Sequence, residues 1–302
     1  MALARISVIG AGLMGHGIAQ VFAVAGHAVK ITDTFPQTLE TVHERIRRNL
    51  REMSLDPAAA ERVECVADFA SVLQDAEAVF EAAPENMELK QKLFAEIERH
   101  APESAILASN TSVMPITEIM KNLRDKTRAL GTHWWNPPFL VPLVEVIRTK
   151  DTSDAAVAAM IAMLKNAGKT AVEVKKDVPG FVGNRLQHAL WREAISIVEQ
   201  GICDAETVDM VVKASFGRRL PVLGPLENAD MIGTDLTLAI HQQVLPHVDA
   251  TRGPSPYLEK LVADNKIGFK TGEGFRKWTA ESGDALRKTV AAHLIEMDKR
   301  KT

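Results

Sequence analysis

His133 and Glu145 have side chains of the types that transfer protons in catalysis, and their positions in the sequence suggest that they meet. His133 ends one apolar run, and Glu145 is the one charge inside a second, Leu143–Ile147, where an unpaired carboxylate would be costly. If the runs form a hairpin around residues 135–141, His133 lies opposite Leu143 with Glu145 as its diagonal neighbour. Glu145 would then fix the imidazole tautomer, and His133 would accept a proton from a hydroxyl. A purely structural ion pair is the alternative interpretation.

A glycine pattern near the start predicts a binding site for a dinucleotide. A short apolar run, residues 6–9, leads into Gly10, Gly12 and Gly15 with the spacing G-x-G-x-x-G, and an apolar helical stretch follows. Gly10 would permit a tight turn, Gly12 would let a pyrophosphate approach the backbone, and Gly15 would let the helix lie close to the strand. The helix N-terminus offers free N–H groups to phosphate. We therefore expect the cofactor to contact Gly10, Gly12, Leu13, Met14 and Gly15.

An acidic residue, Asp33, ends the next apolar run, Ala28–Thr32. Its carboxylate would accept hydrogen bonds from a ribose diol and would repel a 2′-phosphate, which favours NAD over NADP. An ordinary glycine turn is the alternative, but the strand, the helix and this acid all agree with a dinucleotide site.

Polar residues follow two further predicted strands. In a doubly wound sheet the loops at the carboxyl ends of the strands line the cofactor crevice. Ala83, Glu85 and Lys90 follow a strand within residues 77–82, so we expect them near the nicotinamide half, although Lys90 could instead be a surface helix lysine. Asn110 and Ser112 follow another apolar run and are expected to contact cofactor and substrate.

Bulk composition excludes several classes of protein. The 302 residues suffice for two domains, and a net charge of −3 gives no electrostatic case for nucleic acid. No apolar run reaches the length of a membrane span. Cys65 and Cys203 have no metal-type spacing and suit a reducing compartment, so we expect a cytoplasmic protein without a metal site.

Alternating strand and helix patterns end near residues 177–180, where we place the domain boundary. The fold class predicted is α/β, a Rossmann-type doubly wound sheet over residues 1–179, followed by an all-helical domain over 180–302. Helices are expected at 181–200, Ala205–Ala214 and 228–244. Asn184 opens the first of them and is expected to face the first domain.

A basic helix face after the second strand is the one marked cluster of charge. It is formed by Arg45, Arg47, Arg48 and Arg51. We predict a solvated face, and an anion-binding patch for a phosphorylated substrate tail is the alternative.

Taken together, these stretches resemble the L-3-hydroxyacyl-CoA dehydrogenase family over essentially the whole chain. The matching motifs are GAGLMGHGIA with Asp33, APENMELK, SNTS, HWWNPP followed by PLVEV, KDVPGFVGNR, GPLENADMIGTD and KTGEGF. The resemblance implies a Rossmann domain followed by a helical domain that mediates homodimerisation. It also implies oxidation of a hydroxyl β to a carbonyl, with NAD as the hydride acceptor.

The resemblance assigns roles residue by residue. His133 falls at the family's catalytic histidine and Glu145 at its partner glutamate. Ser112 and Asn184 fall at substrate-contacting positions, and Asn136 at the asparagine beside the histidine. The cofactor-contacting positions are matched by Glu85 and Lys90.

Two departures from the CoA-using members concern the substrate. Those members typically carry lysines where this chain reads MSLDPAAAE, and HWWNPPFLVPLVEV looks more like relatives that oxidise free hydroxy acids. Such relatives include the L-gulonate 3-dehydrogenase/λ-crystallin group, carnitine dehydrogenases and a dehydrogenase of pyridine carboxylates. Trp134 and Trp135 would narrow the pocket unless one belongs to the core. The substrate is therefore either a hydroxyacyl-CoA or a small hydroxy acid.

Two other functions remain open. The β-hydroxyacid dehydrogenases related to 6-phosphogluconate dehydrogenase share the two-domain plan but use a lysine base on the long helix of the second domain, and no lysine occurs between Asn184 and Gln200. A structural or sensor protein that binds NAD without catalysis would have no reason to retain His133, Glu145 and Ser112 together.

Overall fold

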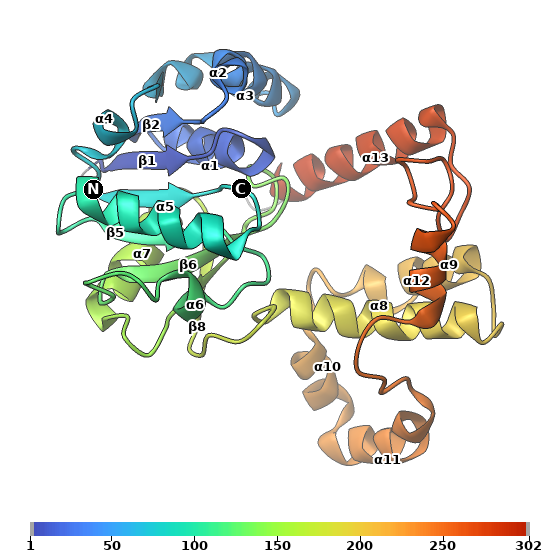
Figure 1. Cartoon of the computed structure of the whole chain (residues 1–302). Helices are drawn as coiled ribbons and strands as arrows, with labels where there is room; N and C mark the ends of the chain where they lie inside the picture. The colour runs from blue at the N-terminus through green and yellow to red at the C-terminus, as the bar shows by residue number, and fades with distance from the viewer. Residues whose placement is uncertain (1–2, 300–302) are drawn as a thin grey trace. The chain divides into compact units, whose positions relative to one another are not determined.

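The computed structural model describes residues 3–299, which divide into two compact units (Figure 1). Of the described residues, the first unit comprises 3–184 and 291–299, and the second is Arg185–Val290. The first holds an eight-stranded sheet with helices, and the second is helical. The predicted fold class is confirmed.

The sheet of the first unit has the strand order β3-β2-β1-β4-β5-β6-β7-β8. Every neighbouring pair is parallel except β6 and β7, which are antiparallel. The carboxyl ends of β1, β2, β4, β5 and β6 therefore meet at one edge, where the amino end of β7 joins them. The strands are β1 (Arg5–Ile9), β2 (Ala28–Thr32), β3 (Val63–Cys65), β4 (Ala78–Glu81), β5 (Ile106–Ser109), β6 (Ala129–Trp134), β7 (Leu143–Ile147) and β8 (Thr170–Val174).

Helices cover both faces of the sheet, and successive strand residues alternate between two buried apolar clusters. In β4, Ala78 and Phe80 belong to one cluster and Val79 to the other. The first cluster includes residues of α1 (Leu13–Val24), α2 (Pro36–Glu40), α3 (Val42–Glu52), the 3₁₀ segment η1 (Pro57–Arg62) and α7 (Asp154–Asn166). The second includes residues of α4 (Phe69–Leu73), α5 (Met87–His100) and α6 (Ile116–Ile119). A sheet buried on both faces explains why its strands read as apolar runs.

The second unit is built from helices that bury little. Between Arg185 and Val290 only Ser196, Leu261 and Gly283 are buried. Its complete helices are α9 (Ala205–Ala214), α10 (Pro225–Ile232), α11 (Thr234–Val244) and α12 (Pro256–Ala263), with 3₁₀ segments η2 (Phe216–Arg218) and η3 (Leu245–His247). Two further helices, α8 (Gly183–Glu199) and α13 (Ala280–Lys299), lie partly in this unit and partly in the first. Among the described helices of the chain, none has the length and hydropathy that a membrane crossing requires.

The single helix predicted over 228–244 was wrong. Two helices, α10 and α11, occupy this stretch, and they are separated at Gly233, whose φ is +97°. A backbone in this region ends a right-handed helix, and glycine adopts it without a side-chain clash.

The compact units divide after Asn184, because residues 182–184 are tied to the first unit. The domain boundary at residue 180 stays a prediction. The amides of Val182 and Gly183 donate to Glu145, and the Asn184 side chain donates to the Ser112 carbonyl. Residues 291–299 are also assigned to the first unit.

Candidate active site

The proton-transfer pair predicted from sequence lies across the two antiparallel strands of the sheet. His133 on β6 is directly opposite Glu145 on β7, and His133 Nδ1 lies 2.7 Å from Glu145 Oε2. The predicted register, with His133 opposite Leu143, was wrong by two residues. The amides of Leu140 and Val141 both donate to the Pro137 carbonyl, so the connection coils and takes up more residues than a simple hairpin loop.

Glu145 is held as an anion in the interior. It is 1% exposed, and its Oε1 accepts hydrogen bonds from the amides of Val182 at 2.9 Å and Gly183 at 3.1 Å. Burial alone would raise the pKa of Glu145, but hydrogen bonds from His133 and from these two amides outweigh it, so the pKa is lowered. An ionised partner favours the imidazole tautomer with its proton on Nδ1, which leaves Nε2 available as a base.

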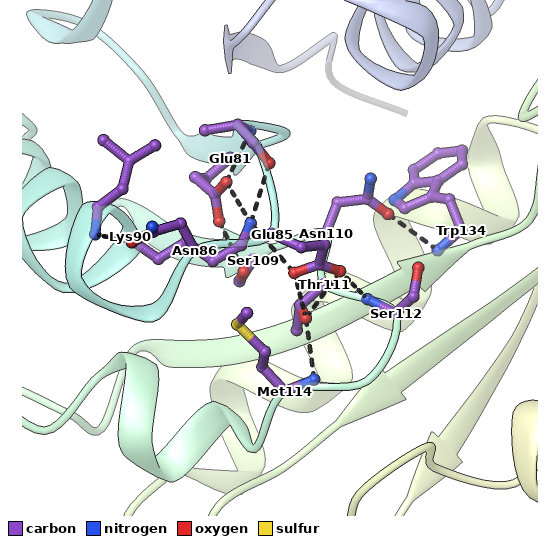
Figure 2. A network of polar contacts seen from close by, with 12 residues as sticks. Glu81, Glu85, Asn86, Lys90, Ser109, Asn110, Thr111, Ser112, Met114 and Trp134 are labelled. Carbon is purple, nitrogen blue, oxygen red and sulfur yellow. Dashed lines mark hydrogen bonds and ion pairs between the residues drawn. The ribbon is translucent and has the colours of Figure 1, made fainter. Parts of the chain in front are cut away.

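Ser112 and Asn184, both predicted at the site, are in contact. Asn184 Nδ2 donates to the Ser112 carbonyl at 2.8 Å. The Ser112 amide donates to Glu85 Oε1 at 2.6 Å, and the hydroxyl of Thr111 donates to the same carboxylate at 2.9 Å (Figure 2). Glu85 thus fastens the turn that carries Ser112, and Asn184 joins that turn to the start of α8.

A buried ion pair behind this turn was missed by the sequence analysis. Lys90 Nζ lies 2.7 Å from Glu81 Oε1, and both side chains are 0% exposed. Ser109 Oγ and the Ala83 amide also donate to Glu81, and Lys90 additionally contacts the Ala83 carbonyl (Figure 2). The surface-lysine interpretation of Lys90 was wrong. Glu81 is a charge within an apolar strand, the same signal that drew attention to Glu145.

The remaining predicted polar residues lie at the same edge of the sheet. Asn110 Oδ1 accepts a hydrogen bond from the Trp134 amide at 3.2 Å, which ties the ends of β5 and β6 together (Figure 2). Asn136 follows β6 and is exposed.

The glycine turn between β1 and α1 is tightly packed at Gly10 and Gly15 and open at Gly12. Gly10 has φ +95°, and a Cβ there would lie 2.8 Å from the Ala82 carbonyl oxygen; a Cβ on Gly15 would lie 1.7 Å from the Gly10 carbonyl oxygen. A Cβ on Gly12 would meet nothing within 4 Å. No side chain caps the start of α1, where Leu13 and Met14 form the first turn. Tight packing on two glycines and open space at the third fit a dinucleotide.

Asp33 is fixed beside this turn at the end of β2. Its Oδ2 accepts from the Ala11 amide at 2.7 Å, and its Oδ1 accepts from the Phe35 amide at 2.9 Å. The carboxylate is half-buried, so part of it faces outward where a ribose diol can reach it.

The basic face of α3 is divided between two environments. Arg47 and Arg51 form ion pairs with Glu61 and Glu44 at the surface, as predicted for a solvated face. Arg45 is different, because its guanidinium donates to the Ala11 carbonyl at 2.8 Å and to the Thr38 carbonyl at 2.9 Å. The prediction of a solvated side chain was therefore wrong for Arg45.

A buried histidine supports the same glycine turn. His16 Nδ1 lies 2.7 Å from the Gly12 carbonyl oxygen, so we assign the ring proton to Nδ1. Burial is the main cause that lowers the pKa of His16, and the charges of Arg45 and Arg48 lower it further, against the hydrogen bond to Gly12. Neither Arg45 nor His16 was predicted at the site, because contacts of these side chains with the turn depend on tertiary packing.

The two tryptophans after His133 have separate roles. Trp134 is 2% exposed and packs in the core, with ring centroids 6.0 Å from Phe22 and 6.1 Å from Phe80. Trp135 lies beside the dyad, with its ring centroid 5.2 Å from that of His133.

The glycine turn follows the carboxyl end of β1, and the histidine–carboxylate dyad lies at the carboxyl end of β6, on the same edge of the sheet. A dinucleotide turn and such a dyad together are the features of an NAD-dependent dehydrogenase. Comparison with known families agrees. The description "3-hydroxyacyl-CoA dehydrogenase, NAD binding domain" matches residues 5–178, and "3-hydroxyacyl-CoA dehydrogenase, C-terminal domain" matches residues 180–278. The chain belongs to the 3-hydroxyacyl-CoA dehydrogenase family, whose members use NAD to oxidise a CH–OH group.

Individual relatives differ in the substrates that their names state. The 5-formyl-3-hydroxy-2-methylpyridine 4-carboxylate 5-dehydrogenase of Mesorhizobium japonicum is 32% identical, with 96% of each chain covered. A crystal structure of a dehydrogenase for the same pyridine acid superposes with a TM-score of 0.91 at 30% identity, covering 99% of this chain and 98% of that one. The (S)-3-hydroxybutyryl-CoA dehydrogenase of Ralstonia eutropha gives a TM-score of 0.76 at 34% identity, covering 92% and 100%.

Proposed function

We propose that this protein oxidises a hydroxyl group β to a carboxyl or thioester carbonyl, with His133 as the base. The buried hydrogen bond of 2.7 Å between His133 and Glu145 is the observation that carries the proposal. His133 Nε2 would remove the hydroxyl proton, while the Glu145 carboxylate holds the ring and stabilises its protonated form. Bound NAD supplies the hydride acceptor. Ser112, Asn136 and Asn184 would orient the substrate by hydrogen bonds.

The cofactor-binding residues proposed are those that surround the glycine turn and the adjacent strand ends. Gly12 and the first turn of α1 would receive the pyrophosphate, and Asp33 the adenosine ribose. On the nicotinamide side we propose Ala83, Glu85 and Asn110. Lys90 would act through the position of Glu85, whose Oε2 lies 3.9 Å from its ammonium. The full set is Gly10, Gly12, Leu13, Met14, Gly15, Asp33, Ala83, Glu85, Lys90 and Asn110.

For the substrate, we propose a small free hydroxy acid. Support comes from the TM-score of 0.91 with the dehydrogenase of a pyridine carboxylic acid, against 0.76 with a 3-hydroxybutyryl-CoA dehydrogenase. The stretch MSLDPAAAE also lacks the lysines expected for a CoA thioester. The second candidate is a hydroxyacyl-CoA, favoured by 38% identity to a probable 3-hydroxybutyryl-CoA dehydrogenase of Bacillus subtilis, with 91% of this chain covered.

The decisive test combines a substrate panel with one variant. NADH production is measured at mildly alkaline pH with L-3-hydroxybutyryl-CoA and a longer thioester, and with 3-hydroxybutyrate, L-gulonate, carnitine and hydroxylated pyridine carboxylates. Turnover of the free acids alone supports the proposed substrate class, and turnover of the thioesters alone supports the second candidate. With the best substrate, His133→Gln should lower kcat by a factor on the order of 10² or more and leave the Kd for NAD⁺ unchanged. Near-wild-type turnover in this variant would remove His133 from the reaction.

We further propose that the protein is a homodimer. The second unit buries only Ser196, Leu261 and Gly283 between Arg185 and Val290, although it is rich in apolar side chains. The exposed apolar residues of the stretch around α10 and α11 form what we call the α10–α11 surface. They are Leu220, Val222, Leu226, Met231, Ile232, Leu236, Leu238, Ile240, Val244 and Leu245. A surface of this kind is typical of a permanent subunit interface.

The compartment proposed is the cytoplasm. Cys65 and Cys203 are both free thiols in this structure, which suits a reducing environment. Fractionation of the source cells with an antibody to the protein tests this proposal.

A further inference from the structure

The start of α8 leaves a gap that one aromatic side chain fills. A Cβ built on Gly183 would lie 2.4 Å from Cζ2 and 3.3 Å from Cε2 of the Trp135 indole. Cβ atoms do not approach a ring carbon this closely, and Cζ2 belongs to a rigid ring. Gly183 has no positive φ that would require glycine for backbone reasons. Its lack of a side chain is therefore explained by the indole.

The same indole edge lies beside the carboxylate of the dyad. The Cβ position of Gly183 is 3.3 Å from Glu145 Oε2, the oxygen that is bonded to His133 Nδ1. The Gly183 amide donates to the other oxygen, Oε1, at 3.1 Å. Trp135 itself is partly exposed, whereas His133 and Glu145 are 3% and 1% exposed. The indole is thus partly exposed, and its Cζ2 edge adjoins the Gly183 position that borders the buried hydrogen bond.

We propose that Trp135 and Gly183 are a matched pair in which the indole covers the Glu145 end of the dyad and keeps water from the His133–Glu145 hydrogen bond. Trp135 is then a positioning residue that acts through Glu145, and Gly183 is the residue that makes room for it. A carboxylate shielded from water holds the imidazole in one tautomer and orientation more strongly. The effect of this shielding on catalysis rests on the proposed function. The shielding of the hydrogen bond by Trp135 does not.

A double-mutant cycle tests the pair without any substrate. In the wild-type background, Gly183→Ala should lower Tm, because the new Cβ displaces the indole. In a Trp135→Phe background the outer ring that carries Cζ2 is gone, so the same change should leave Tm unchanged or raise it, as alanine does in a helix. An equal loss of Tm in both backgrounds would overturn the pair.

A proton NMR signature tests the cover. The hydrogen-bonded Nδ1 proton of His133 should give a far-downfield resonance that exchanges slowly with water, identified by its loss in His133→Gln. Trp135→Ala should broaden it by exchange, and Trp135→Phe should do so less. Trp134→Phe is the matched control, because it lowers Tm through the core yet should leave the resonance intact. A resonance unchanged in Trp135→Ala, or one in fast exchange in the wild type, would overturn the cover. Retained binding of NAD⁺ reports that each variant is folded.

Kinetics then separate this inference from the proposed function. With an active substrate, Trp135→Ala should lower kcat severalfold more than it raises KM, and Trp135→Phe should restore part of kcat. A loss confined to KM would contradict a role through Glu145. If no substrate is turned over while the Tm cycle and the resonance behave as expected, the matched pair stands and the proposed function fails.

Discussion

The two units of the chain use their apolar side chains in opposite ways. The first unit buries them in two clusters on the faces of one sheet, which include Phe22, Phe80 and Trp134 on one face and Phe94 on the other. The second unit buries Leu261 as its one large apolar side chain between Arg185 and Val290, and exposes those of the α10–α11 surface. Burial of apolar surface is the dominant favourable term in folding.

This difference implies that the two units are stabilised in different ways, the first by its own core and the second by assembly. The first unit holds all the buried hydrophobic side chains of the described residues except Leu261, and it carries the dyad, the glycine turn and the Glu81–Lys90 pair within it. The second unit has no comparable apolar interior. We therefore propose that its exposed apolar side chains are buried against a second copy of the chain. Changes in the first unit should therefore act at any protein concentration, and changes on the α10–α11 surface should act through assembly.

The largest effect is expected from breaking the buried ion pair of the first unit. Lys90→Met leaves the Glu81 carboxylate charged and without its cation in the interior, which should cost about 3–5 kcal/mol. The free energy of unfolding, measured by urea titration, should fall by this amount relative to the wild type, and this difference should not depend on protein concentration.

The matched control for this prediction neutralises both partners. Glu81→Gln combined with Lys90→Met removes both charges. The amide oxygen of the glutamine keeps an acceptor for the Ala83 amide, and its NH2 group can donate to the Ser109 hydroxyl oxygen, so most of the lost stability should return. A double variant as unstable as Lys90→Met alone would show that the charge of Glu81 is not the cause.

The next effect concerns the second unit. Leu226→Glu with Leu238→Glu places two charges on the α10–α11 surface, where the native side chains are 80% and 60% exposed. Light scattering should show a mass of about 33.0 kDa instead of twice that value. The control is Gln242→Glu on α11, the helix of Leu238. It adds charge without removing an apolar group and should leave the dimer intact. A wild-type protein that is already monomeric would reject the assembly argument.

The sequence predicted the first unit better than the second, for a physical reason. In the first unit, β2 and β7 have the bounds of the predicted apolar runs, because polar or breaking residues mark the ends of these runs. In the second unit α12 and α13 were not predicted. A helix that does not pack one face against an apolar core has a weak periodicity of apolar residues in its sequence.

Within the site, residue types were predictable and their geometry was not. The His133–Glu145 pairing followed from one charge in an apolar strand, but its register depended on the turn at Pro137. Glu81 gave the same signal and was overlooked. The contact of Arg45 with the glycine turn could not be predicted, because it joins residues far apart in the chain through a long flexible side chain.

A smaller effect tests whether the first unit holds its cofactor site by itself. Arg45→Met removes the donors to the Ala11 and Thr38 carbonyls, so the turn loses a restraint and the Kd for NAD⁺ should rise about tenfold, about 1.4 kcal/mol. Arg47→Met, on the same helix but paired with Glu61 at the surface, should leave the Kd unchanged. Fluorescence titration should give the same ratio in the Leu226→Glu, Leu238→Glu background. A different ratio there would mean that assembly shapes the cofactor site.

The smallest effect expected is a pH dependence from His16 in the first unit. Its pKa in the folded protein is below the ordinary 6.5, mainly because it is buried, so the folded state favours the neutral ring. The unfolded chain binds the proton first as pH falls, so the stability from His16 is complete above pH 6.5 and is lost as pH decreases through the lower folded pKa. His16→Asn should flatten this acid loss in urea titrations, and His188→Asn, an exposed histidine of the second unit, should not. Equal acid sensitivity in all three proteins would place the titrating group elsewhere than beneath the glycine turn.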